Sequence, residues 1–188
     1  MRVSLHREPI GAINIARHYI RDVVYGANDG LITTFAVVAG VAGGALSPTA
    51  VLIVGTANLL ADGLSMGVGN YLSIRSHESA RAAQGLPEEE AAPGRHGAAT
   101  FLAFAVAGAL PLAPYVFVVP SEVRFRLSVF LTLVALFAIG SSRSLVTVDR
   151  WWTAGLEMLL LGAVVAAAAY GSGAFVAWLL VATAEAAV

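Results

Sequence analysis

Long apolar runs alternate with short polar connections along most of the chain, and their lengths predict membrane-spanning helices. The runs occupy about residues 23–45, 48–74, 98–119, 124–142 and 154–171. Each is near the ~20 residues that an α-helix needs to cross the hydrocarbon core of a bilayer. We therefore predict an all-α integral membrane protein with five transmembrane helices. A further apolar stretch, 174–184, is too short to cross alone; it either extends the fifth helix or lies along the membrane.

The positions of arginine predict how these helices are oriented, because the cytoplasmic side retains positive charge next to the spans. With the N-terminus inside, nine arginines are cytoplasmic and two are outside; the cytoplasmic ones are Arg2, Arg7, Arg17, Arg21, Arg75, Arg81, Arg95, Arg143 and Arg150, and the outer ones Arg124 and Arg126. We expect residues 1–22 to form a cytoplasmic N-terminal arm. Residues 23–188 would then form a five-helix transmembrane transport domain with a short cytoplasmic loop at 76–96, and the C-terminus would lie outside.

Composition narrows the functional classes. Hydrophobic residues make up 58% of the chain and charged residues 12%, which is typical of a protein embedded in a lipid bilayer. The formal net charge of −1 argues against a nucleic-acid partner, which needs a basic surface. The absence of cysteine excludes disulfides and thiolate metal sites, so a bound metal must use oxygen, nitrogen or thioether ligands.

A polar stripe lies inside the second apolar run. Asn58, Asp62, Met66 and Asn70 recur every four residues and therefore share one face of a helix. Asp29 lies about seven residues inside the first run, and the short connection between the two runs makes them antiparallel neighbours. This places Asp29 at nearly the depth of Met66, with Asp62 about 6 Å deeper. Ionised groups at such depth cost at least ~2.5 to 3.5 kcal/mol, which makes the two aspartates functional candidates.

Glycine spacing predicts how these two helices approach one another. Gly26 and Gly30 on the first, and Gly63 and Gly67 on the second, form small-x-x-x-small patterns that permit near contact between helix backbones. We expect the two polar faces to meet. Such spacings are common in membrane helices, so each taken alone indicates ordinary helix packing.

The ligand types predict a borderline divalent cation as the transported substrate. Carboxylate and amide oxygens bind divalent cations in general, whereas a thioether is a soft ligand that the hard cations Mg²⁺ and Ca²⁺ bind poorly. Fe²⁺ fits such a mixed site, with Mn²⁺, Co²⁺ or Zn²⁺ as competitors. Carboxylates lose protons when they bind metal and regain them on release, so metal and proton movement can be coupled. We expect metal/proton antiport and no permanently bound cofactor.

Further acidic residues are accessory candidates with competing interpretations. Glu157 lies near the start of the fifth run, where it either contributes to the metal pathway or pairs with Arg143 or Arg150. Glu88, Glu89 and Glu90 follow Pro87 and read as a solvated loop or the first turn of a short helix, with capture of cytoplasmic metal as the minority interpretation. Met66 could instead be a packing residue, and Asn58 and Asn70 could be interhelical hydrogen-bond partners. The two aspartates could instead be protonated and serve as structural hydrogen-bond donors.

Two rival functions remain open. The aspartates could form an intramembrane aspartyl enzyme pair, or Ser172 in "YGSG" could be a nucleophile, although no histidine lies within a span to activate it. A non-transporting membrane scaffold is the other rival. Tolerance of neutral replacements at both aspartates would distinguish it from a transporter.

Three segments resemble the vacuolar iron transporter family of yeast, plants and prokaryotes. They are "YGANDGLITTFAVVAGVAGG", "NLLADGLSMGVGNYLSIRS" and "WWTAGLEMLLLGAVVAAAAYGSG", and the similarity covers nearly all the chain after about Asp22. The resemblance implies a five-helix fold and a homodimer whose pathway, built by the first two helices, lies at the subunit interface. It also implies proton-driven removal of Fe²⁺, often also Mn²⁺, from the cytosol.

The family's functional positions map onto this chain with two departures. Its intramembrane aspartate falls on Asp29 and its pathway methionine on Met66, whereas a glutamate of plant members falls on Asn58. We interpret Asp62, one turn further along the same face, as the replacement carboxylate. The acidic metal-binding domain that vacuolar members carry between helices two and three is reduced here to a short loop, which favours a prokaryotic plasma membrane over a vacuole.

Overall fold

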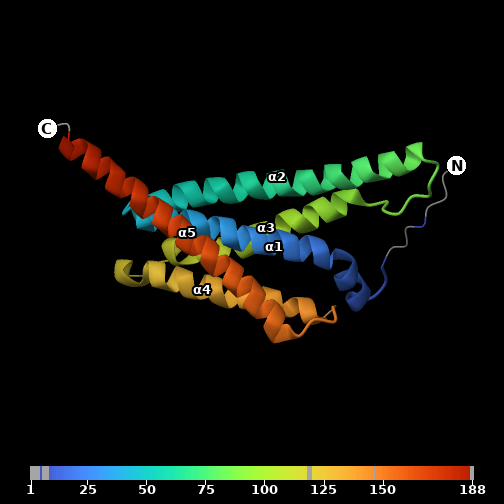
Figure 1. The fold of residues 1–188 in the computed structure, drawn as a ribbon. Helices are drawn as coiled ribbons and strands as arrows, with labels where there is room; N and C mark the ends of the chain where they lie inside the picture. The colour runs from blue at the N-terminus through green and yellow to red at the C-terminus, as the bar shows by residue number, and fades with distance from the viewer. Residues whose placement is uncertain (1–4, 6–8, 118–119, 146, 187–188) are drawn as a thin grey trace.

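The structure is a bundle of five long helices (Figure 1). It is a computed structural model that describes residues 5, 9–117, 120–145 and 147–186, with side chains described up to residue 182. Its helices are α1 (Ala12–Gly43), α2 (Pro48–Ala83), α3 (Pro93–Val116), α4 (Ser121–Ser142) and α5 (Trp151–Ala186), with a 3₁₀ turn at Arg143–Leu145. Within the described residues, five helices are long and apolar enough to cross a membrane, and no strand is present. The predicted all-helical, five-span architecture is confirmed.

Two helices extend beyond the apolar runs that predicted them. α1 begins at Ala12, so much of the predicted arm at 1–22 is helical, and α2 continues to Ala83, so the predicted loop at 76–96 shrinks to residues 84–92. Polarity alone does not end a helix; α2 ends where Gly85 takes a φ of +71° before Pro87. These extensions carry polar residues of α1, α2 and α3 to one end of the bundle.

α3 packs against both α1 and α2. A Cβ added at Gly26 or Gly30 of α1 would collide with the backbone of Thr100 or Phe104 of α3. Gly67 of α2 faces the α3 backbone in the same way, with Gly97 carbonyl oxygen 2.9 Å from such a Cβ. The expectation that these glycines bring α1 and α2 against each other is wrong within one chain, because both glycine pairs accept α3 instead.

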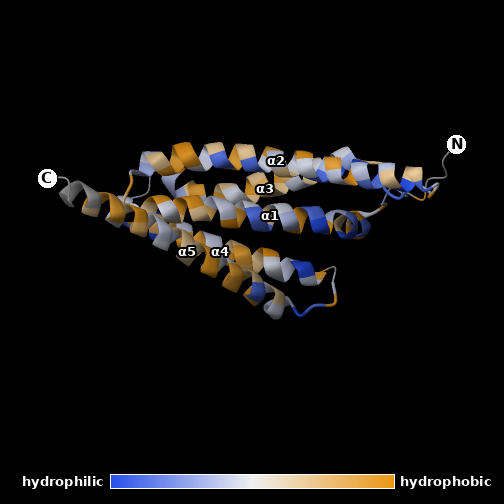
Figure 2. Cartoon of the chain, turned by 45° about the horizontal axis from the view of Figure 1, so that its top comes forward, coloured by the Kyte–Doolittle hydropathy of each residue, from blue (hydrophilic) through white to orange (hydrophobic). Residues whose placement is uncertain are grey.

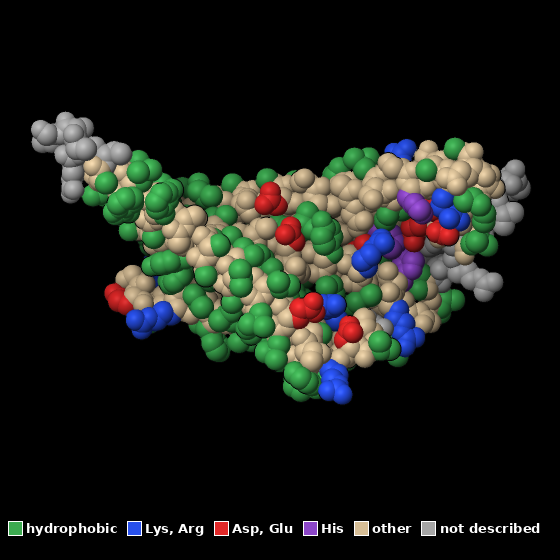
Figure 3. All heavy atoms as spheres, in the orientation of Figure 1, with side chains coloured by type: hydrophobic (Ala, Val, Ile, Leu, Met, Phe, Trp, Pro, Cys, Tyr) green, Lys and Arg blue, Asp and Glu red, His purple; other side chains and the backbone are tan. Residues whose placement is uncertain are grey.

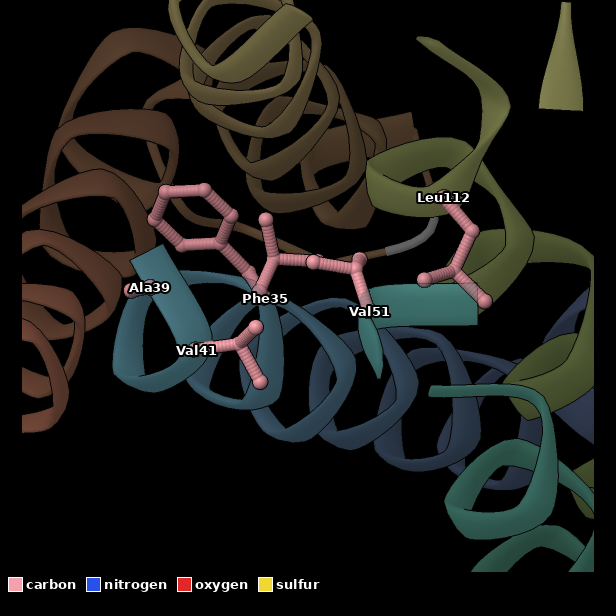
Figure 4. Packing of buried hydrophobic residues seen from close by; sticks show 6 residues of the cluster. Phe35, Ala39, Val41, Val51 and Leu112 are labelled. Carbon is pink, nitrogen blue, oxygen red and sulfur yellow. The ribbon is translucent and has the colours of Figure 1, made fainter. Parts of the chain in front are cut away.

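The apolar core lies between α1, α2, α3 and their neighbours. Phe35, Ala39 and Val41 of α1 pack with Val51 of α2 and Leu112 of α3 in the cluster that Figure 4 shows. A second cluster centres on Leu31 of α1 and includes residues of α3, α4 and α5. α1 therefore lies at the centre of the packing.

The apolar tail at 174–184 extends the fifth helix, which was one of the two predicted alternatives. α5 runs without a break through "GSG" at 171–173. A Cβ at Gly173 would collide with the carbonyl oxygen of Gly40 on α1, so this glycine serves a close helix contact. Figure 1 shows α5 crossing the bundle obliquely and projecting past the other helices. Beyond its first turns, most of its surface is exposed, as expected for a helix that faces lipid.

Polar residues gather at one end of the bundle. The start of α1, the end of α2, the α2–α3 loop and the α4–α5 connection lie together there (Figure 1). Hydrophilic colour concentrates at this end in Figure 2, and Figure 3 shows most arginine side chains in the same half of the molecule. The clustering agrees with the predicted arginine distribution, while the side of the membrane that it faces stays a prediction.

Candidate metal pathway on helices α1 and α2

Asp29 and Asp62 occupy equivalent positions on α1 and α2. Each is followed by a glycine, Gly30 or Gly63, and both glycines pack against Phe104 of α3, which is fully buried. Because neighbouring residues on a helix point about 100° apart, both aspartates are turned to a flank of the contact with α3. Both carboxylates are half-buried, and the charge of Asp62 acts on Asp29. The two predicted aspartates therefore lie on one flank of the same part of α3, near enough for the charge of one to act on the other.

Met66 and Asn58 continue the stripe on α2. Both are half-buried, one turn on either side of Asp62. The side-chain nitrogen of Asn58 is enclosed and makes no hydrogen bond within the described residues. A carboxylate, a thioether and an unsatisfied amide thus share one flank, across from Asp29.

The flank next to these residues is open. Ala61, Ser65 and Gly69 follow one another at four-residue spacing on α2, and all three are exposed. Tyr25, one turn before Asp29 on α1, is also exposed. Asp29 and Asp62 lie beside these exposed residues on their helices. In one isolated chain these carboxylates would lie at the edge of a lipid-facing surface, which is energetically costly.

Asn70 is held away from this group by other partners. Its amide nitrogen donates to Asp22 Oδ1 and to Thr100 Oγ1, each at 2.8 Å. The structure thus gives Asn70 a role in joining α1, α2 and α3. Metal binding by Asn70 stays a prediction.

The accessory glutamates have distinct surroundings. Glu157 is exposed, with a carboxylate oxygen 3.6 Å from Arg143, and lines a cleft of about 410 Å³ between α1 and α5 that also includes Tyr25 and Asn28. Glu89 pairs with Arg81 at 2.9 Å. The segment 84–92 that holds Glu88, Glu89 and Glu90 forms no helix. Glu88 and Glu90 are half-buried, so of the three glutamates only Glu89 is exposed to solvent as a solvated loop would require.

Three residues near the polar end were missed as site candidates from the sequence. Asp22 is 2% exposed and accepts a hydrogen bond from His96 Nδ1 at 2.5 Å, and His18 lies one turn before it on α1. The four-residue spacing of His18 and Asp22 would have revealed a shared face, had the first helix been extended to Ala12. The contact with His96 joins residues 74 positions apart.

Comparisons with known proteins identify the family to which this chain is similar. The model of the VIT family matches residues 20–90 and 77–174. Vacuolar iron transporter 1 of Eucalyptus grandis is 27% identical over 213 aligned residues, covering 83% of this chain and 86% of that protein. Vacuolar iron transporter homolog 5 of Oryza sativa subsp. japonica is 35% identical over 65% of this chain and 64% of its own length. The vacuolar iron transporter of Toxoplasma gondii is 45% identical, over 40% of this chain and 27% of its own length.

Proposed function

Because this chain belongs to the VIT family, we propose that it exports Fe²⁺, and Mn²⁺ as a second substrate, from the cytosol in exchange for protons. The observation that carries the proposal is the approach of Asp29 and Asp62 from two helices onto one flank of α3, with Met66 and Asn58 on either side of Asp62. Several curated relatives are named vacuolar iron transporters, and the ligands here suit the same class of ion.

Each member of the group has a separate task. Asp29 and Asp62 neutralise the divalent charge and exchange protons for it, since two carboxylates close together are most readily ionised when a cation lies between them. Met66 Sδ favours a borderline ion over Mg²⁺ and Ca²⁺. Asn58 offers an amide oxygen on the same face, while Asn70 holds the helices together at the polar end.

A second copy of the chain completes the site. One chain supplies few ligands, and its carboxylates lie beside the exposed small residues Ala61, Ser65 and Gly69. Small residues at this spacing let two helices approach closely, and a two-fold axis along this flank would double every ligand. We place the homodimer contact on the flank formed by α1 and α2.

The absence of cysteine from the sequence makes this contact directly testable. Ser65→Cys changes one atom on the proposed interface, and Ser172→Cys makes the same change on the exposed face of α5. Oxidative cross-linking in membranes should give covalent dimers with Ser65→Cys and monomers with Ser172→Cys. The reverse pattern would place the interface elsewhere.

The polar end, with its concentration of arginines, faces the cytoplasm in this proposal, and α5 ends outside. A prokaryotic plasma membrane is the proposed location, since the connection between α2 and α3 is only residues 84–92. An enzymatic role for Ser172 has no structural support, because its hydroxyl donates to the carbonyl of Ala169 in its own helix.

The decisive experiment is uptake of metal into proteoliposomes that contain a metal-sensitive dye, with and without an imposed pH gradient. Fe²⁺, Mn²⁺, Zn²⁺ and Ca²⁺ are compared for the unmodified chain and for Asp29→Asn, Asp62→Asn and Met66→Ala. Glu122→Gln is the matched control, because it neutralises an exposed carboxylate in the first turn of α4.

Gradient-driven Fe²⁺ or Mn²⁺ uptake that the two aspartate variants lose and Glu122→Gln retains would support the antiporter. Met66→Ala should keep transport but discriminate less against Ca²⁺. Well-folded protein with no uptake of any ion would overturn the proposal and favour a membrane scaffold. Uptake that does not depend on the pH gradient would refute proton coupling but still support metal transport.

A further inference from the structure

A second group of metal-ligating side chains lies at the polar end of the bundle, apart from Asp29 and Asp62. His18 of α1, Glu90 of the α2–α3 loop and His96 of α3 each present a ligand atom, and these atoms lie within 4.8 Å of one another. Glu90 Oε2 is 3.4 Å from His18 Nε2 and 3.0 Å from His96 Nε2. Three separate segments of the chain thus converge on one point.

The orientation of His96 is fixed by Asp22. The ring is 4% exposed, and its Nδ1 lies 2.5 Å from Asp22 Oδ2. A carboxylate that accepts the Nδ1 proton holds the ring in the tautomer whose Nε2 carries a lone pair, which is the usual support for a metal-ligating histidine. His96 Nε2 is buried and lies 3.0 Å from Glu90 Oε2 without the geometry of a hydrogen bond, and it also faces His18. A buried ring nitrogen without a hydrogen bond is what a metal ion would satisfy.

The loop is held in place by the extension of α2. Glu78, which is 8% exposed, accepts the backbone N–H groups of Glu89 and Glu90 at 3.2 and 3.1 Å. Arg81 donates to the carbonyl oxygen of Pro87 and pairs with Glu89. Glu90 is therefore positioned by the protein rather than by a cation, which is the arrangement expected of a preformed site.

A polar cleft of about 480 Å³ leads to this group. Its lining includes Asn70, Ser73, His77, Glu78, Glu90 and His96. An ion in solution at this end of the molecule therefore has an open, negatively charged approach. The lining also includes Arg21, which lies 3.8 Å from Asp22 and has a side chain that is 75% exposed.

We propose that His18, Glu90 and His96 bind one divalent transition-metal ion, with Asp22 as the positioning residue for His96. Two imidazoles and one carboxylate suit Fe²⁺, Co²⁺, Ni²⁺ or Zn²⁺ and disfavour Ca²⁺ and Mg²⁺. Three protein ligands leave coordination positions for water, so the ion is exchangeable rather than structural.

The site connects to the proposed pathway through α1 and α2. Asp22 is seven residues from Asp29, which is about 10 Å along α1 and nearly the same face. Asn70 joins Asp22 to the α2 stripe one turn from Met66. The assignment of this site as the loading station for export rests on the proposed function, whereas metal binding itself does not.

The test separates the two sites by mutation. The background is the full chain with Asp29→Asn and Asp62→Asn, which disables the membrane site. Co²⁺ is titrated into purified protein and followed by its visible absorption and by calorimetry. His96→Asn keeps a side-chain N–H near the position of Nδ1 for Asp22 and removes Nε2. His77→Asn makes the same change at an exposed histidine nearby.

We expect the background protein to bind one Co²⁺ per chain. His96→Asn should weaken binding on the order of 100-fold or more, since loss of a ligand costs at least as much as loss of its supporting group. Glu90→Gln should weaken it at least about tenfold, and His77→Asn should leave it unchanged. Matching thermal stability of His96→Asn and the background confirms that the fold is retained.

The outcomes are distinguishable from failure of the proposed function. Co²⁺ binding with this pattern in a protein that transports nothing would leave the site standing and remove its loading role. Binding that is equal in His96→Asn and the background, or that depends on His77 instead, would overturn the site and leave an ordinary ion-pair network.

Discussion

Removal of Asp22 tests whether the polar end of the bundle depends on one buried carboxylate. Asp22 is 2% exposed and accepts from His96 Nδ1 at 2.5 Å and from Asn70 Nδ2 at 2.8 Å. Asp22→Ala leaves the His96 ring buried without its acceptor. Asn70 retains Thr100 Oγ1 as a partner, so its loss is smaller.

The expected cost follows from these contacts. Removing one partner of a buried hydrogen bond costs about 1–3 kcal/mol, because the other group is left unsatisfied away from water. We expect Asp22→Ala to lower the free energy of unfolding by that amount. Asp149→Ala is the control: Asp149 is about half exposed and 4.0 Å from Arg143, and a pair of that kind contributes less than about 1 kcal/mol.

The measurement is reversible unfolding in mixed detergent micelles, followed by tryptophan fluorescence. A double variant, Asp22→Ala with His96→Leu, sharpens it, because replacing both members of a buried polar pair costs less than the sum of the single changes. If Asp22→Ala is no more destabilising than Asp149→Ala, or if the two changes simply add, the buried contact does not stabilise the fold and the reasoning is refuted.

Three other predictions concern the helices and the pathway. Gly30→Ala should destabilise the fold by about 1–3 kcal/mol, because its Cβ would overlap the α3 backbone, whereas Gly171→Ala, which meets nothing within 4 Å, should be neutral or slightly stabilising in the same unfolding assay. If Asp62 replaces the glutamate that the family resemblance implies at position 58, Asn58→Glu should restore part of the Fe²⁺ uptake that Asp62→Asn abolishes; no recovery in well-folded protein would contradict that replacement. Glu157→Gln should reduce initial uptake rates by less than about twofold, since an exposed ion pair contributes little, and a complete loss would instead assign Glu157 to the pathway.

The sequence by itself determined the five helices and the stripe that carries the proposed metal ligands. Both follow from local periodicity, since a run of apolar residues sets the length of a span and a four-residue repeat sets which side chains share a face. Asp29, Asp62 and Met66 could therefore be selected without coordinates. Resemblance to a transporter family added the expected class of substrate, and the match to the VIT family confirmed the membership.

Only the tertiary structure decided which helix faces which. A pair of glycines four residues apart shows that another helix can pack closely on that face. Gly30 and Gly63 both pack against α3 rather than against each other, because the choice of partner depends on how all five helices pack. The same limit applies to "GSG" at 171–173. Its sequence suggests an end to the fifth helix, but α5 continues through it and Gly173 packs against α1. The group of His18, Glu90 and His96 was beyond the reach of periodicity, since its members come from α1, a loop and α3 and meet only when those segments pack together.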